Sequence, residues 1–132
     1  MNKSKALGRA KIENRYLFFK ISSVNLAIPI LDFDSVVFYN IKKEKKTSKV
    51  FLYRDNEYKI KDLAKYLDIK VDHISKYGII RKKKLVLIYS VVDVGNISGK
   101  MEFHKNITEK AIYRNYVYFK NETYLEINKK IL

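Results

Sequence analysis

Cysteine is absent from this chain of 132 residues, and its absence excludes several kinds of chemistry. Without a thiol the protein has no disulfide framework, no thiolate metal site and no cysteine nucleophile. Long apolar runs are missing as well, because a membrane-spanning helix needs about 18 consecutive apolar residues and the runs here are much shorter. Residues 1–11 are polar and basic and lack the apolar segment of a secretory signal. We therefore expect a cytoplasmic protein.

Residues suited to metal or acid–base chemistry are few and scattered. His73 and His104 are far apart in the sequence, without the second histidine or paired carboxylate that a zinc site or a general base needs. Asp32 and Asp34 would share one face of a strand, but no other catalytic residue type converges on them in the sequence. We expect no enzyme activity, no cofactor and no metal site.

Glycine is also scarce, and two of the four glycines fall close together at Gly95 and Gly99. A phosphate-binding Walker loop has a different glycine spacing and ends in a Lys-Ser or Lys-Thr pair, which is missing here. We interpret residues 91–99 as a turn-rich segment between two subdomains.

Charge of one sign dominates the chain: 28 lysines and arginines against 14 acidic residues give a formal net charge of +14. Such a charge attracts phosphate backbones, anionic lipids and acidic partners. Five of the basic residues are arginine, whereas nucleic-acid-binding proteins tend to concentrate arginine for bidentate phosphate and base contacts. Lysine spread over every solvated face is weak evidence for a nucleic-acid ligand, which stays an open alternative.

Short runs of aromatic and β-branched residues, separated by turn signals, predict a mainly β protein. With 47% hydrophobic residues the chain supports one core, and we expect a flexible basic tail at residues 1–14 followed by a single domain at residues 15–132. The charge run at residues 42–46 predicts a solvated loop, and Asp62 is placed to cap a helical turn at residues 63–67. The expected strands are residues 16–21, 24–30, 36–41, 49–54, 57–60, 77–81, 85–89, 116–119 and 122–126.

The second half of the sequence repeats the strand order of the first half. Residues 77–89 match the hairpin that begins at Tyr16 at an offset of 61, and residues 116–126 match a hairpin that turns at Asp55-Asn56 at an offset of 65. Two such sets of short strands favour two small β-barrels that gain stability by packing on one another. A single continuous antiparallel barrel fits the same pattern.

Three segments, in this order, resemble the CheW family of chemotaxis coupling proteins. Residues 27–36, Ala-Ile-Pro-Ile-Leu-Asp-Phe-Asp-Ser-Val, are similar to the family's opening "AIP" strand and the valine-rich stretch after it. Arg54 followed by Asp62-Leu63 keeps the family's arginine-to-aspartate spacing, and residues 116–132 resemble its closing strand, turn, strand and terminal leucine. The resemblance runs from about residue 15 to the end, and it implies two intertwined, five-stranded β-barrel subdomains with short helical turns.

The sequence departs from the family pattern at four positions. Asp55 stands at the family's glycine position and Lys59 at its proline position, so the turn and the strand there need not keep the family geometry. Ser35 stands where the family usually has glutamate, and Ser90 where an aspartate would fall. The chain is thus identified as a divergent member, in which coupling to some partners is in question.

The resemblance implies five partner-binding residues, Phe33, Ser35, Val36, Arg54 and Asp62. Arg54 would lie on the surface that couples receptor and kinase, where a guanidinium makes charge-assisted hydrogen bonds; alternatively it stabilises its own turn through a neighbouring carboxylate. Phe33 and Val36 would line a groove between the subdomains that accepts an apolar receptor helix, or they are ordinary core residues. For Asp62, the role of a helix cap is the stronger interpretation.

The leading functional hypothesis is a non-enzymatic adaptor of chemotaxis signal transduction. By resemblance, it would bind the regulatory domain of a CheA-type histidine kinase and the cytoplasmic tip of a chemoreceptor. The alternative is a basic β-barrel that binds nucleic acid through lysines and exposed tyrosines, and Tyr116, Tyr118 and Lys120 fit either hypothesis. An open face of alternating tyrosine and lysine would favour nucleic acid, whereas buried tyrosines would favour the adaptor.

Overall fold

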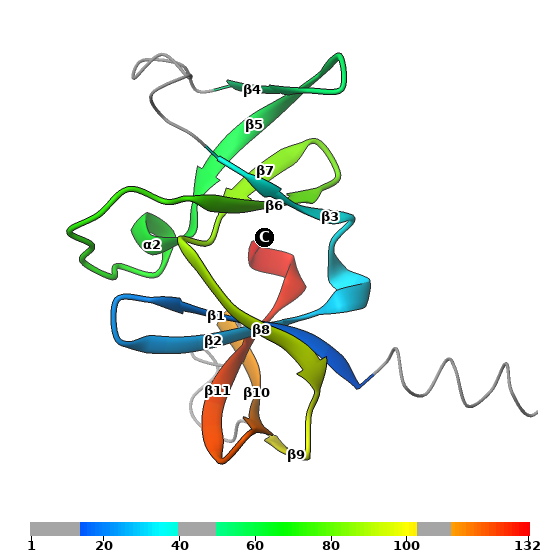
Figure 1. Ribbon diagram of the computed structural model, residues 1–132, viewed down its shortest axis with the longest axis vertical. Coiled ribbons are helices and arrows are strands. Elements are labelled where there is room, and N and C mark those ends of the chain that lie inside the picture. Colours follow the sequence, from blue (N-terminus) through cyan, green and yellow to red (C-terminus); the bar gives the residue numbers. More distant parts are fainter. Residues whose placement is uncertain (1–13, 40–49, 103–111) are drawn as a thin grey trace, which may run out of the picture. The chain divides into compact units, whose positions relative to one another are not determined.

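Strands joined by tight turns make up most of the described chain (Figure 1). The computed structural model describes residues 14–39, 50–102 and 112–132. No helix within these ranges is long and apolar enough to cross a membrane. In chain order the elements are β1 (Arg15–Ile21), β2 (Val24–Pro29), the 3-10 helix η1 (Ile30–Asp32), β3 (Ser35–Phe38), β4 (Val50–Tyr53), β5 (Asn56–Asp62), α2 (Leu63–Tyr66), β6 (Tyr77–Arg81), β7 (Lys84–Leu87), β8 (Ser90–Asn96), β9 (Gly99–Glu102), β10 (Tyr113–Phe119), β11 (Glu122–Ile127) and the 3-10 helix η2 (Lys129–Ile131).

Two compact units divide the chain, and each takes segments from both halves of the sequence. Of the described residues, unit 1 contains those in 14–19, 25–32 and 92–131. Unit 2 contains residues 20–24, residue 132 and the described residues in 33–91.

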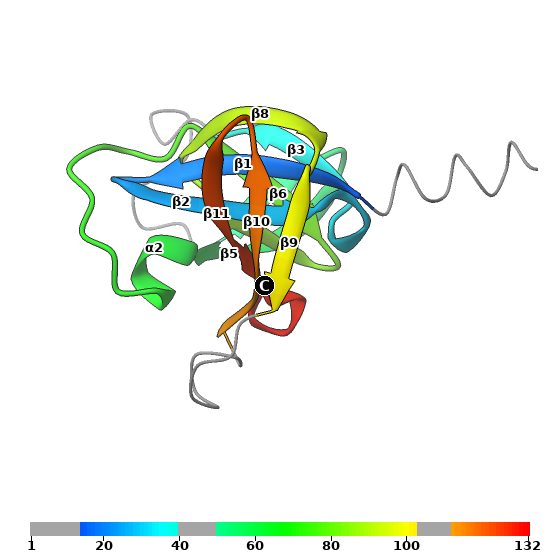
Figure 2. The ribbon, with the colours of Figure 1, turned by 90° about the horizontal axis from the view of Figure 1, so that it is seen from below.

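A six-stranded sheet in the order β8-β1-β2-β11-β10-β9 lies mainly in unit 1 (Figure 2). β10 pairs antiparallel with β9 and with β11. β11 runs parallel to β2, with Leu125 opposite Leu26. The first β-hairpin of the sequence is therefore completed by strands from the end of the chain.

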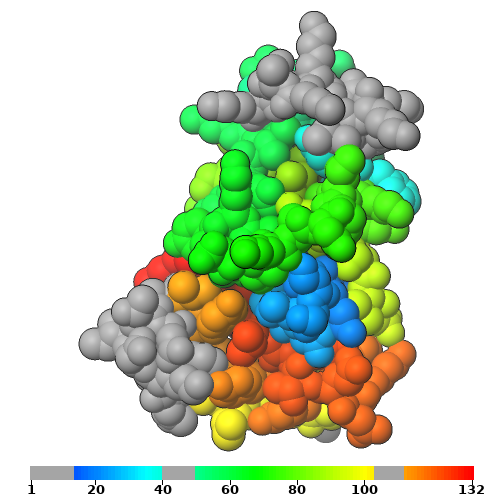
Figure 3. Space-filling view, turned by 90° about the vertical axis from the view of Figure 1, so that its left-hand side faces the viewer, coloured from blue at the N-terminus to red at the C-terminus, as the bar shows by residue number. Residues whose placement is uncertain are grey.

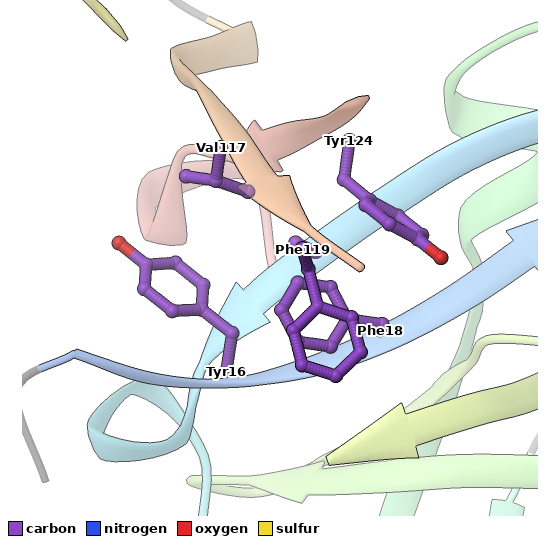
Figure 4. Packing of buried hydrophobic residues seen from close by; sticks show 6 residues of the cluster. Tyr16, Phe18, Val117, Phe119 and Tyr124 are labelled. Atoms are coloured by element: carbon purple, nitrogen blue, oxygen red, sulfur yellow. The ribbon is translucent and has the colours of Figure 1, made fainter. Parts of the chain in front are cut away.

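Aromatic rings fill the core of unit 1 (Figure 4). The rings of Phe18 and Phe119 stack with centroids 4.0 Å apart, and Tyr124 is tilted against Phe18 at 4.8 Å. Gly95 leaves room for this stack, because a Cβ atom at position 95 would lie 2.7 Å from Cε1 of Phe119. Packing of the rings thus requires glycine inside β8.

A five-stranded sheet in the order β3-β6-β7-β5-β4 belongs to unit 2. β6 pairs antiparallel with β3 and β7, and β5 pairs antiparallel with β4. β5 is parallel to β7, with Ile60 opposite Leu85. The sheet curls. Tyr39 directly follows the edge strand β3, and its ring lies 6.0 Å from the ring of Phe51 on the other edge strand, β4. The two edges approach each other there, as in a small, partly closed barrel.

The predicted sequence repeat corresponds to an exchange of hairpins between the two sheets. The β1–β2 hairpin matches β6–β7, and β4–β5 matches β10–β11, yet β2 pairs with β11 and β7 pairs with β5. The turn residues with positive φ set the alignment: Ser22 (55°) corresponds to Lys82 (54°), and Arg54 (49°) to Lys120 (47°). The structural offsets are therefore 60 and 66 residues, one residue away from each predicted value.

The mainly β architecture with short helical turns is confirmed, and two local predictions are wrong. Residues 91–99 are not a turn-rich segment, because β8 and β9 occupy most of them. Their burial alternates residue by residue, which is the period of a strand, and the glycines obscured this signal in the sequence. The turn of the β4–β5 hairpin is Arg54-Asp55, one residue before the predicted Asp55-Asn56, and both turn residues have positive φ.

Some predictions fall outside the described residues. These are the basic tail up to residue 13, the charge run at residues 42–46 and His104. Asn14, the last residue of the predicted tail, is described, and its carbonyl oxygen accepts a hydrogen bond from the N–H of Ile97 at 3.0 Å.

Candidate partner-binding surface

The edge strand β3 exposes two apolar side chains. β3 ends the five-stranded sheet, so β6 pairs with one side of it. Successive side chains of a strand point to opposite faces, and here Val37 is buried while Val36 and Phe38 are 39% and 78% exposed. An edge strand with exposed apolar residues is a ready site for pairing with another chain. We name the residues Phe33, Ser35, Val36 and Phe38 the β3 surface.

Phe38 forms an aromatic pair at this edge with Tyr77 on β6. The two residues are opposite each other in the antiparallel ladder, and their ring centroids are 5.1 Å apart. Neither residue was among the predicted site residues, because the sequence does not show which strand ends a sheet. The sequence carries no signal for the exposed face either, because the residues at positions 36–38 are all apolar.

Three of the five predicted site residues lie on the β3 surface. Phe33 precedes β3 and is half-buried, Ser35 is half-buried opposite Ile80, and Val36 is exposed. The N–H of Asp34 donates to the carbonyl oxygen of Ile80 at 2.7 Å, which holds the start of the segment against β6. Of these three residues, Val36 shares the exposed face of β3 with Phe38, whereas Ser35 lies on the opposite face with the buried Val37.

Arg54 occupies the β4–β5 turn, where its side chain is exposed. Its guanidinium carbon lies 5.1 Å from the ring centroid of Tyr53, a cation–π contact that holds the side chain against the hairpin. Its carbonyl oxygen accepts a hydrogen bond from the side-chain amide of Asn56 at 3.2 Å. Asp55, at the family's glycine position, adopts a φ of 64°, a conformation that aspartate tolerates better than most residues. The hairpin therefore forms without glycine.

Asp62 has the structural role that the sequence favours. It caps α2, and its Oδ1 accepts a hydrogen bond from the N–H of Ala64 at 3.1 Å. The hydroxyl of Tyr89 donates to the same carboxylate, 2.9 Å from each oxygen. Burial raises the pKa of Tyr89 above its usual value, and the hydrogen bond to Asp62 raises it further. The carboxylate thus ties the start of α2 to the residue before β8.

The backbone at Tyr89 explains why sequence patterns missed this contact. Tyr89 has a φ of 75°, which is unfavourable for a tyrosine. Its N–H donates to Oγ of the buried Ser75 at 2.9 Å, and this hydroxyl donates to the carbonyl oxygen of Tyr77 at 2.8 Å. The hydrogen bond to Ser75 and an edge contact with the ring of His73, whose centroid lies 5.7 Å away, help to hold the ring beside Asp62.

The five predicted residues occupy separate regions of unit 2 and do not form a single site. Arg54 lies in the turn before β5 and Asp62 is the last residue of that strand, whose seven residues span about 20 Å. The segment with α2 (green in Figure 3) forms part of the surface at the Asp62 end, where Tyr66 is half exposed. The β3 surface, the Arg54 turn and the Asp62 cap are therefore three regions to be tested individually.

The strand considered for nucleic-acid binding is not an open face of tyrosine and lysine. Tyr116 and Tyr118 are half-buried on β10, and Nζ of Lys120 donates to Oδ2 of Asp93 at 2.8 Å. Other tyrosines are buried within the units: Tyr16, Tyr39, Tyr89 and Tyr124. This distribution favours a protein-binding surface over base stacking at this strand.

His73 makes a surface contact and no catalytic arrangement. Its Nδ1 lies 3.0 Å from Oδ1 of the exposed Asp72, and this hydrogen bond lowers the pKa of Asp72. Among the residues that the structure describes, no group of three or more histidine, aspartate or glutamate side chains could hold a metal ion.

The comparisons with known proteins identify the fold. No family model and no curated protein matches the sequence. Among solved structures, the chain is similar to the scaffolding protein TtCheW from Thermoanaerobacter tengcongensis, with a TM-score of 0.71 and 17% identity over 88% of this chain and 89% of that chain. The protein therefore has a CheW-like fold, as the sequence resemblance predicted. At this level of identity the likeness establishes the fold alone.

Proposed function

We propose that this protein is a non-enzymatic adaptor that acts in the cytoplasm in chemotaxis signal transduction. It would couple chemoreceptors to a CheA-type histidine kinase by holding both partners, since scaffolding requires binding surfaces and no bond chemistry. The CheW-like fold supports this proposal, because the similar structure is that of a scaffolding protein.

The exposed aromatic residue on β3 is the observation that carries the proposal. Phe38 is 78% exposed, on the same face of β3 as Val36 and beside the ring of Tyr77. Burial of a phenylalanine side chain contributes about 1.5–3 kcal/mol. A protein partner can bury this ring in an apolar surface, whereas the phosphate backbone of a nucleic acid binds cationic groups.

Binding to the regulatory domain of a CheA-type kinase tests the proposal, with Phe38→Thr as the main variant. Threonine keeps the strand preference but removes the ring, so we expect at least tenfold weaker binding with an unchanged melting temperature. Ile74→Thr is the matched control, because Ile74 is 54% exposed in the connection between α2 and β6. Arg54→Ala tests the second region, and its effect should shrink as salt increases.

The same titrations with a single-stranded oligonucleotide separate the two functions. The adaptor predicts kinase binding that changes little with moderate salt. Absence of kinase binding, or equal effects of Phe38→Thr and Ile74→Thr, would contradict the proposal.

A further inference from the structure

A pocket of about 430 Å³ opens in unit 2 beside β5. Lys59 on β5 and Lys82, Lys83 and Lys84 around the β6–β7 turn line it, together with Tyr58 and Glu57. We call it the lysine pocket. Its volume lies in the range of small-molecule sites.

Backbone pairing, and not chance exposure, brings these lysines together. The N–H of Lys59 donates to the carbonyl oxygen of Lys83 at 2.9 Å, and Lys59 stands opposite Lys84 in the parallel ladder. Lys82 has a φ of 54°, so the tight turn places three consecutive lysines at the end of the hairpin. Like charges in direct opposition on neighbouring strands are destabilising.

Basic side chains outnumber acidic ones in the pocket lining. Four lysines and one glutamate give the pocket lining a net formal charge of +3. The ion pairs of the described chain lie elsewhere, at Asp72–His73 and Lys120–Asp93. Nζ of Lys84 donates to the backbone oxygen of Leu132 at 3.2 Å. Burial lowers the pKa of Lys61, and the charge of Lys84 lowers it further.

The lining suits an anion. Lysine ammonium groups bind phosphate as compact point charges. The ring of Tyr58 and the aliphatic stems of the lysines supply apolar surface for an organic group. We propose that the lysine pocket binds a phosphate-bearing ligand of nucleotide size, either a free nucleotide or one unit of a single strand. This site is independent of the adaptor function.

Titration of the full chain with ADP, with an oligothymidylate and with pyrophosphate tests this proposal. The double variant Lys59→Gln/Lys83→Gln removes two pocket charges, and Lys65→Gln/Lys100→Gln removes two exposed lysines elsewhere. We expect at least tenfold weaker ADP binding for the pocket variant and less than threefold for the control. Amide chemical shifts of residues 82–84 should move on binding.

Further variants test the organic part and the source of the ligand. Tyr58→Leu should weaken ADP binding while leaving pyrophosphate binding within twofold. Tighter binding of the oligothymidylate than of ADP, with a steep salt dependence, assigns the site to single strands, and the reverse order assigns it to free nucleotides.

Three results would overturn the proposal. These are no binding of ADP or oligothymidylate at millimolar concentration, equal losses from the two double variants, or tighter binding of an acidic peptide than of either ligand. Removal of opposed charges should not unfold the sheet, and melting temperatures of both double variants check this.

Discussion

Removal of the Asp62 carboxylate should lower stability more than the loss of any exposed carboxylate. In Asp62→Ala, the N–H of Ala64 loses its cap and the hydroxyl of Tyr89 loses its acceptor. Loss of a cap costs about 1 kcal/mol, and a buried hydroxyl without a partner costs about 1–3 kcal/mol. We therefore expect the free energy of unfolding to fall by about 2–4 kcal/mol.

Urea unfolding followed by circular dichroism measures this change, and three further variants locate its origin. Asp62→Asn keeps an oxygen for the cap and should lose less than alanine does. Asp72→Ala removes an exposed carboxylate and should cost under about 0.5 kcal/mol. In a double-mutant cycle, Asp62→Ala and Tyr89→Phe should be coupled by about 1 kcal/mol or more.

The cycle also decides between the two roles considered for Asp62. A stability change for Asp62→Ala that is no larger than for Asp72→Ala would refute the structural role. Weaker kinase binding by a fully stable Asp62→Ala protein would instead place Asp62 on the partner surface.

Three other perturbations test the core of unit 1. Tyr16→Phe removes the hydroxyl that donates to the buried carboxylate of Glu126 at 2.8 Å, so it should lower thermal stability by about 1–3 kcal/mol. Gly95→Ala should destabilise the fold by about 1–3 kcal/mol, because the new Cβ atom would lie 2.7 Å from the Phe119 ring. Gly99→Ala should be tolerated, because the nearest atom to its Cβ would be 3.5 Å away. Equal melting temperatures of the two variants would contradict this prediction. Burial and the hydrogen bond to a carboxylate raise the pKa of Tyr124 from 10.0 to about 12. The unfolded chain loses the Tyr124 proton near pH 10, whereas the folded protein keeps it up to about pH 12. The free energy of unfolding should therefore fall as the pH rises from 10 to 12, and Tyr124→Phe should reduce this loss.

Local patterns in the sequence were sufficient for the hairpins but not for β8 and β9. Residues 77–81 were predicted as a strand and form β6 with the same bounds, because β-branched residues and a lysine turn follow each other directly. β8 and β9 were missed, because Gly95 and Gly99 resemble turn residues in the sequence. Gly95 is required by a ring from β10, a contact between segments far apart in the chain.

The candidate site shows the same limit. The helix cap at Asp62 was predictable because it depends on residues two positions away. The exposure of Phe38 was not, because it depends on which face of β3 other parts of the chain cover. The lysine pocket likewise arises where β5 meets the turn before β7, whereas the sequence shows these lysines as part of a general basic bias.

The exchange of hairpins explains why the sequence repeat is weak although the two sheets share a plan. β2 and β7 correspond in the repeat, but β2 pairs with β11 and β7 pairs with β5. Each hairpin therefore packs against the opposite repeat. The paired segments are 99 residues apart at Leu26 and Leu125 and 25 residues apart at Ile60 and Leu85. Packing constrains these cross-strand pairs and not the similarity between the repeats, so both pairs are apolar while the equivalent turn positions differ, Ser22 in one repeat and Lys82 in the other.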